Sequence, residues 1–465
     1  MKAARGVLLV ALALLAIAAI RDVARLGDAL PWHQMYDFAD FYCAGTALDR
    51  GADPYRYEPL HGCEHRVNTG DAYRTDARRV IPAPLPPYDF PPLALAARLS
   101  FSTARNLDAL LIVLAIVAVV AGLVLTGVSL DVASLALVLP AGFVLLAAGQ
   151  VVPFALVALV FTGLALARGR APLAGIVAAL TVIEPHLGLP VCAALFCWVP
   201  RSRIALTATL LVLSGIGVLT VGVTGIAEYL RSVLPAQAAA ETTYAYQYSL
   251  TYLLRTLGVP ASAALPIGEL SYLILLLAGV WLGGRTARAL RRPELVAYVA
   301  GACSVIAGPY VHMVDLPFAI PAALVFACRL TGRPQQVAVA ALVMLAIPWI
   351  PVWIVKKLFL ATLFVVAALL VRLRAGVGFS IVAFAAVTLA IYFLELAPPA
   401  PLTATTSGNF LPSDLAQSAW AAYVAALGSP SLTWLAVKIP SWAALCALIA
   451  VALETSRTQR SPAAP

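Results

Sequence analysis

Residues Ala109 to Leu125 read ALLIVLAIVAVVAGLVL, an unbroken apolar run without a charged side chain. A helix needs about 20 mostly apolar residues to cross about 30 Å of hydrocarbon, and this run with its flanks predicts a membrane span at 106–127. Several later stretches are shorter, and those that flank Pro185 and Pro309 are predicted to be broken or partly re-entrant helices. We place these further spans at 131–148, 152–168, 172–184, 187–200, 203–224, 262–283, 294–308, 313–329, 337–355, 358–371, 377–396 and 434–453.

The composition agrees with lipid as the solvent of this chain. Hydrophobic residues make up 62% of the 465 residues and charged residues 11%, whereas soluble domains are about 45–50% apolar and about 25% charged. Each span must satisfy its own backbone hydrogen bonds, so the spans must be helices. The net charge of +9 does not indicate nucleic-acid binding, because the basic residues stand in short clusters between apolar runs. We therefore predict an all-α polytopic membrane protein.

The apolar runs divide the chain into five parts. Residues 1–20 carry Lys2 and Arg5 ahead of an apolar run, which resembles a secretory signal peptide. Cleavage near Ile20 is one alternative, but an uncleaved first helix with a cytoplasmic N-terminus is favoured because many spans follow. A polar loop at 21–105 precedes a transmembrane core at 106–329, and 330–453 holds the C-terminal spans with an outer loop at 398–433. Residues 454–465 are predicted to be a disordered cytoplasmic tail, after a bundle of about 11–14 transmembrane helices.

The basic clusters predict which loops face the cytoplasm, because cytoplasmic loops carry an excess of Lys and Arg. Short loops around Gln150, Glu184 and Pro309 hold no Lys or Arg. The long loop 21–105 is rich in Arg, but long loops translocate largely regardless of charge. This loop, Glu184 to His186 and Gly308 to His312 are therefore predicted to share the extracytoplasmic face. Only Lys356-Lys357 breaks the pattern; the cytoplasmic clusters are Arg168 to Arg170, Arg201 to Arg203, Arg285 to Arg292, Arg329 to Arg333 and Arg372 to Arg374.

The polar loop begins with a segment of helical spacing. Phe38, Phe41, Gly45 and Leu48 recur at that spacing, which predicts a short amphipathic helix at the membrane interface. Asp37 precedes the helix and Asp40 lies in its first turn. One interpretation makes Asp37 an N-cap and Asp40 a carboxylate favoured by the helix dipole. The other makes one of them a general base that faces a cavity.

Other polar residues also allow two interpretations. Glu184 and His186 are either a functional pair at a broken helix or side chains that reach interfacial water. His312 and Asp315 lie one turn apart and form either a structural pair or part of a site. The pattern His61-x-Cys63-x-His65 has no obvious fourth ligand, so we predict no metal. Cys43 and Cys63 share the outer loop and could form a disulfide, and residues 414–426 with Trp420 predict a second interfacial helix with an aromatic anchor.

An ordered set of short motifs resembles glycosyltransferase family 87, membrane mannosyltransferases and relatives with the GT-C fold. The set starts with Asp37-Phe38-x-x-Phe41-Tyr42-x-Ala44, Gly51-x-x-Pro54-Tyr55 and Tyr88-x-Phe90-Pro91-Pro92. It continues with Gly149-Gln150-Val151-Val152, Pro185-His186-Leu187, Gln247-Tyr248-Ser249-Leu250 and Gly308-Pro309-Tyr310, followed by His312 and Asp315. The match covers roughly residues 36 to 320. Family members take sugars from polyprenyl-phosphate donors.

The resemblance implies an activity and a set of site residues. It implies an inverting transfer of a mannose-like hexose or a pentose to a lipid or glycan acceptor outside the cytoplasm of a cell membrane, without a cofactor. The catalytic Asp of the family matches Asp37, with Asp40 as the close second. Glu184 stands where relatives often have a Lys, which puts that donor contact in doubt. The substrate-binding positions implied are Tyr88, Gln150, Glu184, His186, Tyr310, His312 and Asp315, with Arg56, Arg66 and Arg74 as further phosphate ligands.

Two other functions remain open from the sequence. A polytopic transporter or lipid flippase is expected to show inverted repeats and ionisable residues spread along its spans. This sequence shows no convincing repeat, and its ionisable residues gather at one predicted face. A catalytically degenerate GT-C family member is the second alternative, because Glu184 departs from the family pattern.

Overall fold

The computed structural model describes residues 35–67, 77–306, 308–354, 358–373, 408–428 and 432–457. The predicted spans at 1–20 and 377–396, Arg74, Lys356-Lys357 and most of the predicted tail lie outside these ranges. Within them the chain is helical and holds no strand, only the isolated bridges Arg56–Leu415 and Gln247–His312.

Helices occupy almost every predicted span. The first half contains α3 (Phe38–Asp49), α4 (Tyr57–Val67), η2 (Pro87–Asp89), α6 (Phe90–Ala96), α7 (Phe101–Leu125), α8 (Leu130–Pro140), η3 (Ala141–Leu146), α9 (Val152–Ala167), α10 (Ala171–Ala179), η4 (Leu180–Ile183), α11 (Pro185–Trp198), η5 (Pro200–Ser202) and α12 (Arg203–Glu228). The second half contains η6 (Tyr229–Val233), α13 (Leu234–Ala240), α14 (Leu250–Thr256), α15 (Ala261–Leu290), α16 (Leu295–Ser304), η7 (Met313–Ala319), α17 (Ile320–Arg329), α18 (Gly332–Leu345), α19 (Trp349–Ile354), α20 (Leu358–Arg372), α22 (Ala416–Ala426), α23 (Leu432–Ala436) and α24 (Ile439–Arg457).

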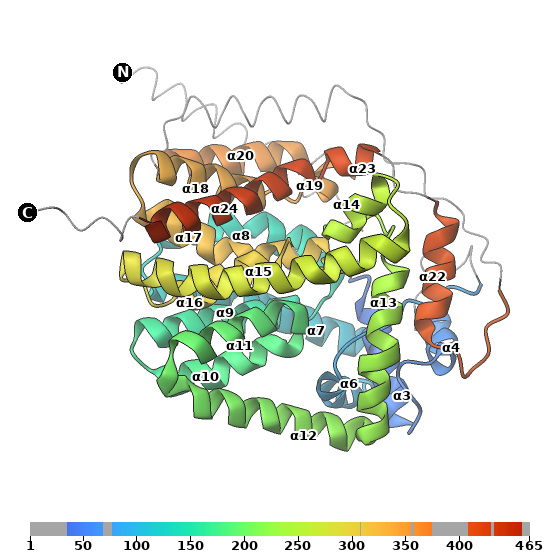
Figure 1. Ribbon diagram of the computed structural model, residues 1–465. Helices are drawn as coiled ribbons and strands as arrows, with labels where there is room; N and C mark the ends of the chain where they lie inside the picture. Colours follow the sequence, from blue (N-terminus) through green and yellow to red (C-terminus); the bar gives the residue numbers. More distant parts are fainter. Residues whose placement is uncertain are drawn as a thin grey trace, which may run out of the picture.

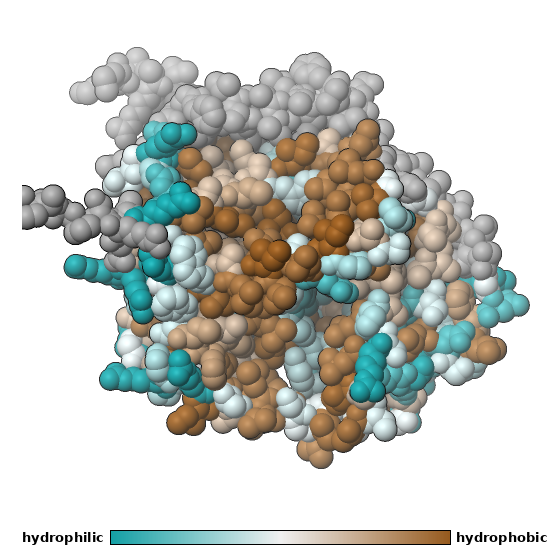
Figure 2. Space-filling model, in the orientation of Figure 1, coloured by the Kyte–Doolittle hydropathy of each residue, from teal (hydrophilic) through white to brown (hydrophobic). Residues whose placement is uncertain are grey.

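The distribution of apolar side chains is that of a membrane protein. Four described helical segments are long and apolar enough to cross a membrane: Phe101–Leu125, Pro200–Ala240, Ala261–Leu290 and Leu432–Arg457. Three of them, containing α7, α12 and α15, expose large apolar side chains, and Leu219 on α12 is 89% exposed. Figure 2 shows hydrophobic surface over the middle of the molecule and hydrophilic residues toward its two ends. A surface of this kind is stable against lipid and costly in water.

Close helix contacts fill the interior of the bundle. The hydroxyl of Tyr298 on α16 donates to the backbone oxygen of Val160 on α9, 3.1 Å away. A Cβ atom added at Gly163 would lie 2.4 Å from the Tyr298 ring, so only glycine permits this approach. Small residues that let helix backbones approach are typical of packing between membrane helices.

Basic side chains gather at one end of the bundle. At one end, Arg292 and Arg329 donate to the backbone oxygens of Thr126 and Gly127, over 2.6 and 3.2 Å. Arg372 pairs with Asp131 beside them. In Figure 1 this end lies at the left, whereas α3, α4, α6, α13 and α22 lie at the right. The basic loops predicted to be cytoplasmic thus stand opposite the polar loop.

Three local features go beyond the predicted spans. Tyr88 lies in η2, and a separate short helix, α6, follows it and ends before Ser100 caps α7. The predicted span 337–355 is broken between α18 and α19, because Pro348 lacks an N–H and disfavours helical backbone in the residue before it. Helix α3 forms as predicted, but it is buried on almost every side and does not present one face to lipid.

Candidate functional site

Helix α3 begins at Phe38 with Asp37 at its N-cap position, yet the Asp37 side chain makes no capping hydrogen bond. The backbone N–H of Asp37 donates to the oxygen of Ala148, 2.8 Å away, which ties the start of α3 to the end of the η3 segment. The Asp37 carboxylate instead accepts a hydrogen bond from Nε2 of Gln150. Gly149 permits this approach with a φ of +70°, and an added Cβ there would crowd Phe38 at 3.1 Å. The predicted Asp37 and Gln150 are therefore partners.

The two early aspartates lie in different environments. Asp37 is partly exposed, whereas Asp40 is 1% exposed inside α3. Burial raises the pKa of Asp37, while the Gln150 hydrogen bond and the positive charges of His312 and Arg79 lower it; the net pKa is above the usual range. Asp37 is thus the more accessible carboxylate and the one coupled to His312.

The segment that carries His312 is held by a short pairing with residues 246–248. Val311 donates its N–H to Oε1 of Gln247 over 2.9 Å, and Tyr248 donates its N–H to Val311 over 2.6 Å. The backbone N–H of His312 donates to Oδ2 of Asp315 over 2.7 Å. These bonds fix the His312 backbone before η7 begins. His312 and Asp315 are therefore paired, through a hydrogen bond from the His312 backbone to the Asp315 side chain.

Asp315 also connects His312 to the broken helix at Glu184. Nε2 of His186 lies 3.1 Å from Oδ2 of Asp315, and Nδ1 of His186 lies 3.6 Å from Oε2 of Glu184. The Tyr310 ring centroid lies 4.6 Å from that of His312 and 5.7 Å from that of His186. These contacts join five residues into one cluster: Glu184, His186, Tyr310, His312 and Asp315. Their loops were predicted to share one face of the membrane.

Tyr88 approaches the same break from η2. Its hydroxyl donates to the backbone oxygen of Val182 over 2.7 Å. Burial raises the pKa of Glu184 to about 7, against the lowering effect of His186. The neighbouring Asp89 has a buried Oδ2 without a hydrogen-bond partner in the described part of the chain, and burial raises its pKa well above the usual range. Tyr88 thus supports the break at Glu184 and does not reach the imidazoles by a hydrogen bond.

Glu241 is a central residue of the cluster that the sequence did not reveal. It follows α13, is 2% exposed, and its Oε2 lies 3.2 Å from Nε2 of His312. Trp420 of α22 donates to its other oxygen over 2.5 Å. The predicted helix around Trp420 is present, but the Trp420 side chain is 3% exposed and acts as a buried donor, so the prediction of an interfacial anchor is wrong.

A buried lysine supports the same region and was also missed. Lys438 is fully buried at the start of α24, and its Nζ donates to the backbone oxygen of Gln247 over 2.6 Å. The Lys438 ammonium also lies 3.3 Å from the centroid of the Tyr252 ring, a cation–π contact. No periodic pattern indicates such a residue, because its partners come from distant parts of the chain.

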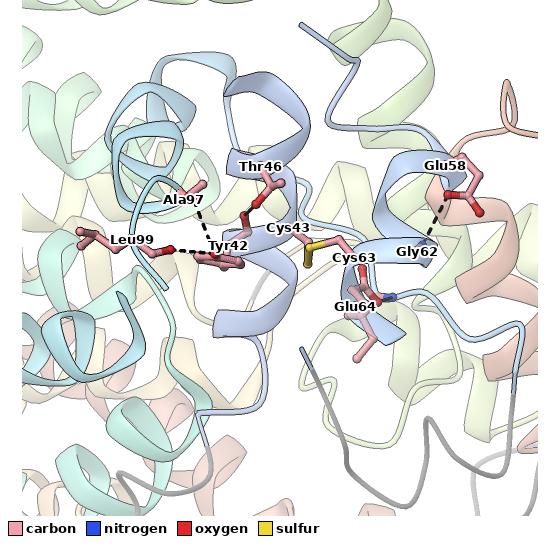
Figure 3. Close-up of a disulfide and its surroundings, with 10 residues drawn as sticks. Tyr42, Cys43, Thr46, Glu58, Gly62, Cys63, Glu64, Ala97 and Leu99 are labelled. Atoms are coloured by element: carbon pink, nitrogen blue, oxygen red, sulfur yellow. Dashed lines mark hydrogen bonds between the residues drawn. A yellow bond between two sulfur atoms is a disulfide. The ribbon is translucent and has the colours of Figure 1, made fainter. Parts of the chain in front are cut away.

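A disulfide joins α3 to α4. Cys43 and Cys63 are bonded, with their Cα atoms 5.6 Å apart (Figure 3). On the other side of α3, the Tyr42 hydroxyl donates to the backbone oxygen of Leu99 over 2.9 Å. Cys63 is therefore not available to the metal pattern considered above, and His61 pairs with Glu58 at 2.9 Å. The described residues contain no cluster of three or more potential metal ligands.

Of the arginines considered as phosphate ligands, one forms ion pairs within the protein and another is exposed. Arg56 pairs with Asp53 and Glu228 and also donates to Ser413. Arg66 is exposed on α4. A cation that the sequence analysis did not select, Arg79, lies with its guanidinium 4.5 Å from the Tyr423 ring and lowers the pKa of Asp37 through its charge.

Comparisons of this chain with protein-family models, with curated proteins and with solved structures find no match. The function must therefore be argued from the cluster itself. A partly exposed carboxylate with a raised pKa can accept a proton near neutral pH. A neighbouring imidazole that carries a positive charge can stabilise negative charge that develops beside it.

Proposed function

We propose that this protein is an integral membrane glycosyltransferase of GT-C type. It transfers a mannose-like hexose or a pentose from a polyprenyl-phosphate donor to a lipid or glycan acceptor at the extracytoplasmic face of the cell membrane. The observation that carries the proposal is the position of Asp37: it stands at an N-cap position without capping, is partly exposed, accepts a hydrogen bond from Gln150 and lies within electrostatic range of His312.

The proposed reaction is a single inverting displacement. Asp37 takes the proton of the acceptor hydroxyl while that oxygen attacks the anomeric carbon. The bond between the anomeric carbon and the phosphate oxygen breaks, and its electron pair leaves with the polyprenyl phosphate. His312 and Arg79 are the two residues whose positive charges lower the pKa of Asp37. They are proposed to stabilise the departing phosphate. Glu184 pairs with His186 and does not supply the positive charge that a Lys would bring.

The test is transfer from radiolabelled polyprenyl-phosphate sugars by the purified protein. Asp37→Asn removes the base without changing its size, so transfer should fall about 10²–10⁴-fold. Asp49→Asn, at the other end of α3 and paired with Arg98, is the matched control and should retain transfer. Full transfer by Asp37→Asn would refute the assignment of the base. Loss of transfer in Asp40→Asn alone would move the role to Asp40.

A transporter or lipid flippase is the alternative that one observation favours. Carboxylates and imidazoles alternate from Glu184 through His186 to Asp315 and again from His312 to Glu241, and the backbone N–H of His312 links the two groups through Asp315. Such chains carry protons in membrane transporters. In proteoliposomes, movement of a labelled lipid or solute that responds to a proton gradient, without any sugar transfer, would support this function. A degenerate family member would show neither activity.

A further inference from the structure

The Glu241 carboxylate accepts four hydrogen bonds in the protein interior. Oε1 accepts from Gln237 and Trp420, at 3.2 and 2.5 Å, and Oε2 accepts from Gln247 and His312, both at 3.2 Å. An ionised carboxylate offers about four lone-pair positions, whereas a protonated one must also donate. The four donors therefore suit the charged form of Glu241.

His312 is the donor that can balance this charge. Glutamine and tryptophan side chains are neutral, so three of the four hydrogen bonds bring no positive charge to Glu241. A buried carboxylate without a counter-charge is strongly unfavourable, even after the surroundings relax. Burial by itself lowers the pKa of His312, but Glu241, Asp315 and Asp37 raise it, and the net pKa lies above the usual range.

The His312 ring is held on several sides. Nε2 faces Glu241, the Tyr310 ring lies 4.6 Å away, and the Tyr244 ring meets it edge-on at 6.1 Å. The titratable groups that face this ring come from several elements: Asp37 before α3, Glu184 and His186 at the start of α11, Glu241 and Tyr244 after α13, and Tyr310 and Asp315 around η7.

We propose that Glu241 is a positioning residue that keeps the His312 imidazole positively charged, so that this charge stabilises the phosphate that leaves the donor. This inference rests on the proposed function for the identity of the ligand, but not for the state of His312. Glu241 acts through His312 and does not itself contact the substrate.

The decisive variant is Glu241→Gln, which keeps the shape of the side chain and removes its charge. The pKa of His312, followed by NMR with labelled histidine, should fall by about one unit or more. An opposite charge close to a titratable group shifts its pKa by this amount, and the variant removes that charge. In transfer assays, KM for the donor should rise, and the alkaline limb of the pH profile should move to lower pH. Glu241→Asp retains the charge, so its His312 pKa and its KM for the donor should lie close to those of the unmodified protein.

Trp420→Phe is the matched control, because it removes a neutral donor from the same carboxylate and leaves its charge. It should leave the His312 titration above the usual histidine range. An unchanged titration in Glu241→Gln would refute the proposal. If Glu241→Gln does not fold, a His312 that is neutral above pH 6.5 in the unmodified protein refutes it equally. A shifted His312 titration in a protein that transfers no sugar would instead refute the proposed function and leave this inference standing.

Discussion

At the scale of the residue, the hydrogen bond between Gln150 and Asp37 sets how easily the proposed base is protonated. Gln150 donates to the charged form of the carboxylate and so lowers the pKa of Asp37 against the effect of burial. The base must be deprotonated to act, so activity is lost as the pH falls through this pKa. Because the net pKa is raised, the acid limb should lie above that of an ordinary aspartate.

Gln150→Leu should move this acid limb further toward higher pH. The variant removes the interaction that favours the carboxylate, and a hydrogen bond to a charged group is worth about 1.5–3 kcal/mol, which corresponds to about one pH unit or more. The measurement is the pH dependence of kcat/KM for sugar transfer. Thr46→Val, which removes a hydroxyl bonded to Tyr42 within α3, should not move the limb. A limb that stays in place in Gln150→Leu would contradict the assignment of Asp37 as the titrating base.

The sequence could identify these residues only where a local pattern or a resemblance placed them. Asp37, Gln150 and His312 stand in short motifs, and the charge pattern put their loops on one face. Glu241 stands in no such motif, since its partners His312 and Trp420 lie 71 and 179 residues away. The same holds for Lys438 and Gln247, which are 191 residues apart. Long-range pairing of this kind leaves no periodicity in a single sequence.

At the scale of the element, the position of α3 depends on its attachments. The helix itself was predictable from helical spacing between Phe38 and Leu48, and it spans Phe38–Asp49. Its burial was not, because hydrophobic spacing cannot distinguish lipid from a covering of other helices. The disulfide to α4 and the Tyr42 bond to Leu99 hold α3 from two sides (Figure 3). The position of Asp37 therefore depends on contacts made by Tyr42 and Cys43, further along the helix.

Removing the disulfide should loosen α3 and reduce activity. Cys43 and Cys63 close a loop of sequence separation 20, for which the loss of the bond costs about 3 kcal/mol. The double variant Cys43→Ala, Cys63→Ala should melt at a lower temperature in detergent and transfer sugar more slowly. Cys197→Ala, which changes an exposed free cysteine, is the control and should leave both properties unchanged. Equal melting temperatures for the double variant and the unmodified protein would contradict a stabilising role for this bond.

At the scale of the whole molecule, the two ends of the bundle are chemically distinct. One end gathers Arg292, Arg329 and Arg372 around Thr126 to Asp131. The other carries α3, α4, α13 and α22, with Asp37 at the N-cap position of α3 (Figure 1). Between the ends lies the apolar surface of α7, α12 and α15 (Figure 2). Because cytoplasmic loops carry an excess of Lys and Arg, we expect the end with these arginines to face the cytoplasm and the other end to face outward.

The orientation can be tested by the access of a membrane-impermeant maleimide to single cysteines in intact cells. Leu411→Cys places a thiol at a position 61% exposed just before α22, and it should be labelled from outside. Arg170→Cys places a thiol at an exposed position before α10, among the basic residues, and it should be labelled only after the membrane is made permeable. The exposed Cys197 and Cys446 are first replaced by alanine so that neither contributes.

The labelling result decides where the proposed chemistry can occur, because Leu411 lies on the segment whose Asp414 accepts the N–H of Tyr57, at the end of the molecule that holds Asp37. A polyprenyl-phosphate sugar presented on the outer leaflet reaches Asp37 only if this end faces outward. Labelling of Arg170→Cys in intact cells, with Leu411→Cys protected, would place Asp37 in the cytoplasm. A nucleotide-linked sugar would then be available to the protein, and the argument for a lipid-linked donor would lose its physical basis.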